Sequence, residues 1–299
     1  MMAGMYAAIS GLDANQEMLN ETASNLANVN TVGYKAASVT FADSLTQVMR
    51  GASGPTSTNG GSNVLQIGLG VQVSATQNEM TEGSFQSTSN PLDIAIEGNG
   101  FLRIGAGSPP AKEPYTEGLP TSLKYTRAGD LSTNELGFLT TQAGEYVIGR
   151  NAVAKETETG PTFEPGKEES YIRIPPGSSD ISIGQDGSVG YTDEEQGSKN
   201  FQKRITAGYI TLATFPNEAG LERIGGSNWV QSANSGQPVV GTPDTGGFGA
   251  TIGGELEQSN VDLATEMTNM ITAERGYQAN SRVISTADEM LGTLVTMAG

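Results

Sequence analysis

The sequence of 299 residues contains neither cysteine nor histidine. Without cysteine there is no disulfide framework and no thiol nucleophile, and without histidine the commonest general base is missing. The two absences together also remove the usual ligands of zinc. Most familiar kinds of active site are therefore excluded, and we expect no metal, no cofactor and no enzymatic activity.

Basic residues are scarce as well. The chain has 16 lysines and arginines against 33 aspartates and glutamates, a formal net charge of −17. Binding to nucleic acid or to an anionic membrane surface needs clustered positive charge, so neither partner is expected. The first basic residue is Lys35, so the N-terminus lacks the basic region of a secretory signal peptide. No apolar run approaches the roughly 20 residues that a transmembrane helix needs, so we expect no membrane insertion.

Aromatic residues make up only 6% of the chain, whereas glycine occurs 40 times and proline 13 times. This composition is typical of many short strands and turns rather than of a helical bundle, although both ends have a different pattern. We therefore predict an α+β protein in four parts. They are an N-terminal helix over 1–34, a connecting region over 35–75, a central antiparallel β-rich domain over 76–250, and a C-terminal connection and helix over 251–299.

Apolar residues near the N-terminus recur at alternating steps of three and four, with one polar interruption, which is the spacing of a coiled-coil seam. They are Met2, Met5, Ile9, Leu12, Gln16, Leu19, Ala23 and Leu26. The run ends in Asn28, Asn30 and Gly33, which are residues typical of turns and helix ends. The pattern predicts one long amphipathic helix.

A second apolar stripe near the C-terminus repeats every seven residues. Its members are Leu263, Met270, Tyr277, Ile284 and Leu291. Ser259 and Asn260 offer N-cap side chains, and Asp262 falls in the first turn, where the helix dipole favours a negative charge. A helix from about 261 to 297 would be roughly 55 Å long at about 1.5 Å per residue.

The two helices admit two interpretations. They pair as a coiled coil within one chain, or the pair also packs against copies of itself, because two helices alone leave much of each stripe in water. The residues expected to form this assembly core are Ile9, Leu12, Leu19, Leu26, Leu263, Met270, Tyr277, Ile284 and Leu291.

Between the helices the hydrophobic pattern alternates with period two, which predicts strands. Residues 93–97 and 101–104 flank Gly98-Asn99-Gly100, a pattern that predicts a hairpin whose glycines adopt positive φ. Further short strands are expected at 171–174, 180–184, 188–191 and 209–215, with a turn at 185–187.

Three candidate sites have simpler explanations. The glycines of 98–100 lack the third glycine of a dinucleotide fingerprint and precede a strand. The acidic run 193–195 lacks the spacing and central glycine of a calcium loop and fits a solvated turn. Asp262 and Glu266 resemble a catalytic carboxylate pair, but they fall in the opening turns of a helix, where acids are favoured electrostatically.

Residues 51–63 are rich in glycine, serine, threonine and asparagine, a composition typical of a flexible linker. The segment lies between two patterned regions. A neighbouring subunit that covers it would order it, which is a second interpretation.

Both ends of the chain carry residues that resemble one family. Residues 24–35, which read SNLANVNTVGYK, resemble the signature of bacterial flagellar hook and rod proteins, and residues 259–263, 270–271 and 275–281 resemble the second signature of the same family. Residues 66–71, 92–101 and 214–221 resemble its other landmarks. The signature residues are Asn25, Asn28, Asn30, Gly33, Tyr34, Lys35, Ser259, Asn260 and Arg275.

The resemblance implies a structural subunit that polymerises helically into the flagellar axial tube. It implies export in the unfolded state by the flagellar type III apparatus without a cleaved signal, with the terminal helices lining the inner tube and the β domain outside. The implied partners are other copies of the chain, adjacent axial and junction proteins, and an export chaperone or cap protein. The implied location is the hook and basal body.

Within this family, residues 245–249, 261–263 and 276–281 resemble those of hooks more than those of distal rods, which favours the hook, a universal joint. The alternative is the distal rod, a drive shaft, because residues 51–66 resemble the stretch that stiffens it. Two interpretations from other classes are another secreted tube-forming protein and a hydrolase that uses acidic residues. The first would not need both terminal signatures, and no spaced carboxylate pair at strand ends supports the second.

Overall fold

The computed structural model describes residues 2–55, 60–110, 115–157, 160–194 and 203–298. The chain divides into two compact units. Unit 1 comprises Met1–Val29, Ala36–Glu79 and Val261–Gly299, and unit 2 comprises Asn30–Lys35 and Met80–Asn260. The short segment Asn30–Lys35 thus belongs to unit 2, although the residues on both sides of it belong to unit 1.

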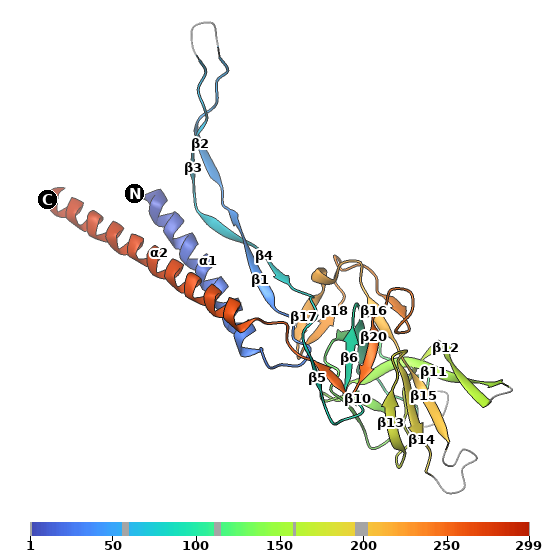
Figure 1. Cartoon of the computed structure of the whole chain (residues 1–299). Helices are drawn as coiled ribbons and strands as arrows, with labels where there is room; N and C mark the ends of the chain where they lie inside the picture. The colour runs from blue at the N-terminus through green and yellow to red at the C-terminus, as the bar shows by residue number, and fades with distance from the viewer. Residues whose placement is uncertain (1, 56–59, 111–114, 158–159, 195–202, 299) are drawn as a thin grey trace. The chain divides into compact units, whose positions relative to one another are not determined.

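Two long helices and a β-ribbon form unit 1. Helix α1 spans Met2–Ala27 and helix α2 spans Leu263–Ala298, so the predicted terminal helices are confirmed. Their packing against each other is antiparallel (Figure 1). At about 1.5 Å per residue the 36 residues of α2 are roughly 54 Å long. The structure does not establish that the pair is a coiled coil.

The ribbon of unit 1 is a long antiparallel excursion of the chain (Figure 1). At its base β1 (Ala37–Asp43) pairs with β4 (Val71–Asn78), with a bulge between Thr40 and Phe41. Further out β2 (Thr46–Arg50) pairs with β3 (Leu65–Gly68), and every residue of both strands is exposed. The Gly- and Ser-rich insert continues this ribbon, since Ser53 and Ser62 form a β-bridge; positions 56–59 lie outside the described residues.

Among the described residues, unit 2 contains a sheet of thirteen strands whose order in the sheet differs from their order in the sequence. The strand pairs of this sheet are antiparallel. Its strands are β7 (Phe101–Gly105), β8 (Lys124–Thr126), β9 (Leu131–Thr133), β10 (Leu139–Thr141), β11 (Tyr146–Thr157), β12 (Gly160–Tyr171), β13 (Ser179–Ile183), β14 (Ser188–Thr192), β15 (Arg204–Ile210), β16 (Leu212–Thr214), β17 (Glu222–Gly225), β18 (Asn228–Val230) and β19 (Val239–Gly241). The main path runs β13-β14-β15-β11-β7-β8-β18-β17. A central antiparallel β-rich domain is therefore confirmed.

Two small sheets and one short helix complete unit 2. Strand β6 (Ile94–Glu97) pairs with β20 (Ala250–Gly253), and β5 (Phe85–Ser87) pairs with β21 (Glu255–Glu257). A 3-10 helix, η1, spans Glu218–Gly220.

The two hydrophobic core clusters of the described residues both lie in unit 2. Successive residues of a strand face opposite sides, and β7 uses both: Leu102 and Ile104 belong to the larger cluster, whereas Phe101 belongs to the smaller one. In the smaller cluster the Tyr125 and Phe215 rings meet edge to face at 4.8 Å between centroids. This double burial makes β7 the central strand of the unit.

The predicted hairpin of residues 93–104 is wrong. Strands β6 and β7 belong to different sheets, because β6 pairs with β20 and β7 pairs with β8, β11 and β16. Both strands are almost wholly buried, so each needs partners on the interior of the domain rather than a single hairpin neighbour. The glycines do adopt positive φ, 100° at Gly98 and 138° at Gly100.

Other strand predictions have mixed outcomes. The turn expected at 185–187 is confirmed, and it joins β13 to β14, which pair with each other. The strand expected at 209–215 is interrupted at Thr211, which separates β15 from β16. Of residues 171–174, only Tyr171 belongs to a strand, and Arg173 forms an isolated bridge with Phe138.

Candidate functional site

Two glycines in the contact between α1 and α2, here called the seam, each face an asparagine of the other helix. A Cβ on Gly11 would lie 2.6 Å from Nδ2 of Asn280, and a Cβ on Gly276 would clash with Oδ1 of Asn15. The step from 11 to 15 along α1 is matched by the step from 280 back to 276 along α2, which defines the antiparallel register. Glycine at these positions lets the backbones approach and leaves room for a polar side chain.

The buried residues of both helices are small or polar. The buried residues of α1 are Ala8, Gly11, Ala14, Thr22 and Asn25, and those of α2 are Ala273 and Ala287. Three residues of the predicted apolar stripe, Ile9, Leu12 and Leu26, directly follow one of these buried residues in the sequence. They therefore lie about 100° further round the helix. Leu12, Leu19 and Leu26 are accordingly half-buried, and Ile9 is 41% exposed.

The ribbon packs on yet another side of α1. The backbone N–H of Val71 donates a hydrogen bond to Oγ of Ser10 at 3.2 Å, and a Cβ on Gly70 would clash with the same oxygen. Because Ser10 follows Ile9, the ribbon and α2 lie on two sides of the helix that flank the apolar stripe. Neither of them covers Ile9.

On α2 the predicted stripe is also only partly covered. Met270, Ile284 and Leu291 are half-buried, whereas Leu263 and Tyr277 are exposed. Other large apolar side chains of the helix are exposed as well. They are Met267, Ile271, Val283, Met290, Leu294, Val295 and Met297. The structure therefore does not gather the nine predicted assembly residues into one core, and their role in assembly stays a prediction.

Asn25 joins three segments of unit 1. Its Nδ2 donates to the carbonyl oxygen of Ala37 at 2.8 Å, and its Oδ1 accepts from the backbone N–H of Ala37 at 3.1 Å. The same Nδ2 lies 3.1 Å from Oε1 of Glu266 on α2. The side chain is buried, so it acts as a substitute strand partner for the first residue of β1 while contacting α2.

The remaining signature residues of the two helix ends have different surroundings. Asn28 donates from Nδ2 to the carbonyl oxygen of Ser24 at 2.9 Å, just beyond the end of α1. Asn30 and Arg275 are exposed, and Ser259 is buried. Asn260 donates to the backbone and the hydroxyl of Thr81, at 3.1 and 2.9 Å.

The N-cap of α2 is Asp262 rather than Ser259 or Asn260. Its Oδ1 accepts hydrogen bonds from the backbone N–H groups of Ala264 at 2.9 Å and Thr265 at 3.4 Å. These bonds, together with one from the Thr265 hydroxyl, lower the pKa of Asp262. The capping role predicted for the acids at this helix start is thus observed for Asp262, while Glu266 contacts Asn25.

The signature residues Gly33, Tyr34 and Lys35 are buried in unit 2. Gly33 has φ 65°, and a Cβ there would lie 2.5 Å from the backbone nitrogen of Ala128, so only glycine fits. The guanidinium of Arg223 lies 4.7 Å from the Tyr34 ring centre and donates to the Tyr34 hydroxyl at 3.1 Å. These contacts fix the segment within the β-rich unit.

Lys35 belongs to a buried ion cluster with Glu257 and Arg127. The Lys35 Nζ lies 2.5 Å from Oε1 of Glu257 and donates to the carbonyl oxygen of Thr81 at 2.7 Å. Arg127 Nη1 lies 3.3 Å from the other carboxylate oxygen, and its guanidinium stacks over Phe101 at 5.3 Å. Burial lowers the pKa of Lys35, and attraction to the Glu257 carboxylate opposes that shift.

Sequence reasoning missed several residues of this arrangement. Gly11 and Gly276 carried a usable signal, because a glycine inside a helix costs about 1 kcal/mol relative to alanine and so points to a close contact. Glu257 and Arg127 had no such signal. Glu257 lies 222 residues from its partner Lys35 and looks like any strand glutamate.

The described parts of the chain show no metal site made of three or more acidic side chains. In the same residues, no helix combines the length and apolar character needed to cross a membrane. Glu195, the last residue of the acidic run 193–195, lies outside the described residues.

Three family models match the chain. Residues 5–35 match the flagella basal body rod protein model, residues 95–191 match the flagellar hook protein FlgE/F/G D1 domain, and residues 252–297 match the C-terminal model of flagellar basal body rod FlgEFG proteins. The matched ranges include both predicted signatures and part of unit 2.

Curated relatives are similar over nearly the whole chain. The flagellar basal-body rod protein FlgG of Bacillus subtilis strain 168 is 38% identical over 99% of both chains, and that of Agrobacterium fabrum is 38% identical over 97% of both. The flagellar hook protein FlgE of Borreliella burgdorferi is 26% identical and covers 99% of this chain.

These similarities correct the preference for hook over rod. The two relatives at 38% identity are named as rod proteins, whereas the hook protein is 26% identical, so the comparisons support the rod alternative better than the hook. The local resemblances at 245–249, 261–263 and 276–281 were outweighed by similarity across the entire chain. This chain belongs to the family of flagellar rod and hook proteins, which are structural components of the flagellar axial tube and not enzymes.

Proposed function

We propose that this chain is a rod subunit that polymerises helically with copies of itself as the distal rod of the flagellar basal body. Two relatives that are 38% identical over nearly the whole chain are named as rod proteins, which supports a rod. The hook is the second candidate, because a hook protein is similar over the same length and the insert does not by itself separate the two.

One observation carries the proposal of self-assembly. Among the described residues, 23 large hydrophobic side chains are exposed, and 19 of them belong to unit 1. Unit 2, which has both core clusters, accounts for the other four: Leu136, Val153, Ile224 and Val239. Unit 1 on its own leaves much of its apolar surface in water, which is the character of a surface that other subunits cover.

The helices supply most of this surface, with one set of exposed apolar side chains on α1 and another on α2. The stripe around Ile9, Leu12, Leu19 and Leu26 is offset from the seam with α2, so the same helix can contact its own α2 and a neighbouring subunit at once. On this proposal 1–34 and 251–299 line the inner tube and 76–250 lies outside, with 35–75 as the connecting region. Ordering of the helices is then coupled to assembly.

The exposed ribbon supplies the remaining surface. Its apolar side chains include Leu45, Val48, Met49 and Leu65, all more than half exposed. We assign to the ribbon and its insert the contact that locks adjacent subunits and stiffens the tube, with the insert becoming ordered against a neighbour.

The route to the tube and the other partners follow from the same proposal. The chain is exported unfolded by the flagellar type III apparatus without a cleaved signal. It then contacts adjacent axial and junction proteins, with an export chaperone or a cap protein as further partners.

The assembly surface is tested by two charge substitutions, Leu19→Asp and Ile284→Asp. A charge placed in an apolar interface costs several kcal/mol, so we expect the concentration needed for polymerisation to rise at least roughly a hundredfold. Asn20→Asp and Ser285→Asp are matched controls, because both residues are exposed neighbours on the same helices. Sedimentation measures the polymer, and tryptophan fluorescence of the single Trp229, buried in unit 2, checks that the β-rich unit stays folded.

Electron microscopy of the assembled tubes gives the second readout. Straight, rigid tubes support the rod, whereas curved and supercoiled tubes support the hook. Normal tubes from Leu19→Asp and Ile284→Asp would contradict the assignment of the assembly surface.

A further inference from the structure

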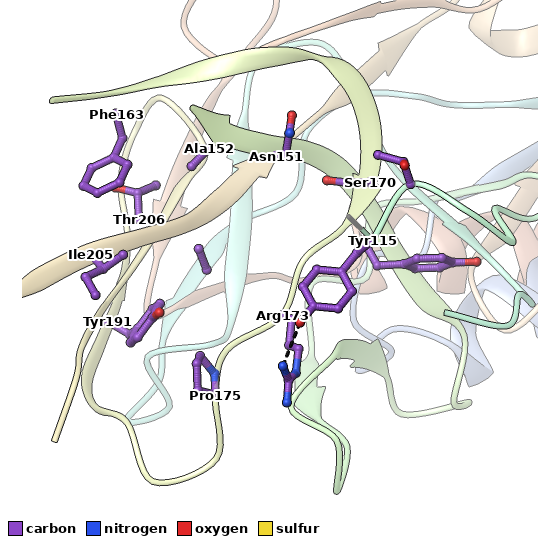
Figure 2. Close-up of a pocket in the computed structure, with 13 residues that line it drawn as sticks. Tyr115, Asn151, Ala152, Phe163, Ser170, Arg173, Pro175, Tyr191, Ile205 and Thr206 are labelled. Atoms are coloured by element: carbon purple, nitrogen blue, oxygen red, sulfur yellow. Dashed lines mark hydrogen bonds between the residues drawn. The ribbon is translucent and has the colours of Figure 1, made fainter. Parts of the chain in front are cut away.

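A cavity of about 310 Å³ lies in unit 2, outside every feature discussed above (Figure 2). Four aromatic side chains line it: Tyr115, Phe163, Tyr171 and Tyr191. In Figure 2 Phe163, Ile205 and Tyr191 gather on one side of the cavity, and Asn151, Ser170 and Tyr115 lie on the other. Its size is near the lower end of ligand-binding cavities, so it suits a small molecule.

Two polar groups at this cavity lack hydrogen-bond partners. They are Oδ1 of Asn151 and Oγ of Ser170, which are both buried and have no partner among the residues that the structure describes. Buried polar atoms are nearly always paired, so each unpaired one calls for an explanation. Their occurrence on adjacent strands at one cavity points to a ligand that supplies the missing hydrogen bonds.

The strand geometry around Asn151 is irregular. The pairing of β11 with β12 shifts register between Arg150 and Ala152, where Asn151 alone lies opposite residues 166–168, so β12 bulges across from Asn151. The pairing of Asn151 with Gly208 of β15 is retained. Bulges redirect side chains and are over-represented beside functional sites. Gly166 opposite leaves room for the Asn151 amide, because a Cβ at that position would clash with its Oδ1.

Among the described residues that line the cavity, the one cation already has hydrogen-bond partners. Arg173 donates from Nε to the carbonyl oxygen of Leu136 at 2.9 Å and from Nη1 to the Tyr115 hydroxyl at 2.7 Å. It also lies 5.7 Å from the Tyr115 ring centre. The two groups that lack partners are neutral. The amide oxygen of Asn151 needs a donor, and the hydroxyl of Ser170 can donate or accept. A negatively charged ligand has less to gain here than a neutral one.

We propose that this cavity binds a neutral sugar ring. Hydroxyl groups of a pyranose donate to Oδ1 of Asn151 and pair with Oγ of Ser170, and its C–H face lies against an aromatic wall such as Tyr191. A water molecule would supply the hydrogen bonds but would leave the aromatic walls without a contact. The inference does not depend on tube assembly.

Saturation-transfer NMR on the full-length chain tests the proposal. The probes are the methyl glycosides of glucose, galactose and N-acetylglucosamine, with glucuronate as the charged comparison. We expect saturable binding of at least one neutral probe in the millimolar range, and weaker binding of glucuronate. Ser170→Ala removes one hydrogen bond and should weaken binding roughly fivefold to tenfold.

Ser170→Ala separates a binding role from a structural one. Removing an unpaired hydroxyl should leave the melting temperature of the free chain unchanged or slightly higher, because no existing bond is lost. Ser87→Ala, on an exposed strand residue outside the cavity, should leave both binding and melting unchanged. Absence of saturable binding for every neutral probe would overturn the proposal. So would self-association that Ser170→Ala abolishes, because a second copy would then occupy the cavity.

Discussion

At the scale of single residues, Glu257 is the most constrained side chain of the signature region. Its carboxylate is fully buried and faces two cations, Lys35 and Arg127, and it also accepts a hydrogen bond from the backbone N–H of Gly83 at 3.1 Å. Buried ion pairs contribute little net stability, but removing one member leaves the others charged and unpaired. The family signature at Lys35 is therefore a structural requirement of unit 2.

Glu257→Gln is expected to destabilise unit 2 by about 3–5 kcal/mol, because two buried cations lose their counter-charge. Lys35→Met should cost less, since Glu257 keeps Arg127 as its partner. Denaturant unfolding followed by Trp229 fluorescence measures both free energies within unit 2. Glu222→Gln is the matched control on an exposed strand residue and should change stability by less than about 0.5 kcal/mol. Equal stability of Glu257→Gln and the control would contradict the cluster's role.

At the scale of elements, the antiparallel register of α1 and α2 depends on glycines that the helices would otherwise avoid. Gly292, in the same helix as Gly276, has no atom within 4 Å of the place a Cβ would occupy, whereas Gly11 faces Asn280. Replacing each of these two glycines by alanine therefore compares the same substitution in open space, at Gly292, and at the seam, at Gly11.

Gly292→Ala should stabilise α2 by about 1 kcal/mol through helix propensity alone. Gly11→Ala gains the same propensity but must displace Asn280, so it should be at least 1 kcal/mol worse than Gly292→Ala. Adding Asn280→Ala to Gly11→Ala should restore part of the difference. Thermal unfolding followed by circular dichroism at 222 nm measures all three variants against the unsubstituted chain. Identical effects of the two glycine substitutions would show that the seam is not as close as described.

A second prediction for α2 concerns acid. The hydrogen bonds from Ala264 and Thr265 lower the pKa of Asp262 below its ordinary value of 3.8. A carboxyl whose pKa is lowered by folding stabilises the helix above its unfolded pKa, and that contribution is lost as pH falls through the folded pKa. The protection factors of the Ala264 and Thr265 amides, which compare exchange with that of an unfolded amide at the same pH, should therefore fall below about pH 4. Asp262→Asn keeps a capping side chain without a titrating group, so its exchange should lack this acid step.

The contrast between helices and sheets explains how much of the fold could be predicted. The helices follow from local spacing, and α1 and α2 were found within a few residues of their bounds. The partners of β6 and β7 are distant in sequence, so local turn glycines at 98 and 100 suggested a hairpin that does not form. Strand pairing beyond neighbours is set by burial in the finished domain, which periodicity alone does not encode.

The candidate site was predictable to a similar extent. The signature positions Gly33 and Lys35 were identified from resemblance, and their physical reasons appear only in three dimensions, in a positive φ and a buried ion cluster. The spacing of the apolar residues predicts the helix α1, but it does not show that this stripe is offset from the seam with α2. A sequence shows which residues are apolar and leaves open which neighbour covers them.

At the scale of the whole molecule, unit 2 contains the cores and unit 1 exposes the apolar surface. The ribbon is the part of unit 1 that has no counterpart in an ordinary helix pair, and it ends in the insert. Arg50 of β2 pairs with Leu65 of β3, so the tip can be removed at that pair without disturbing the strands below it. Removing the tip therefore tests the role of the insert in tube stiffness separately from the role of the helices in assembly.

Replacing residues 51–64 by Asn-Gly, the residues favoured in a two-residue hairpin turn, should leave β2 and β3 paired. We expect the variant to polymerise, because the helix surfaces are unchanged, and its tubes to bend where the original tubes are straight. A variant with the same segment replaced by glycine and serine of equal length distinguishes loss of specific contacts from loss of length. Electron micrographs measure curvature in all three. Straight tubes from the shortened variant would show that the insert does not stiffen the tube, and the apolar strands Thr46–Arg50 and Leu65–Gly68 would then be the remaining candidates for that contact.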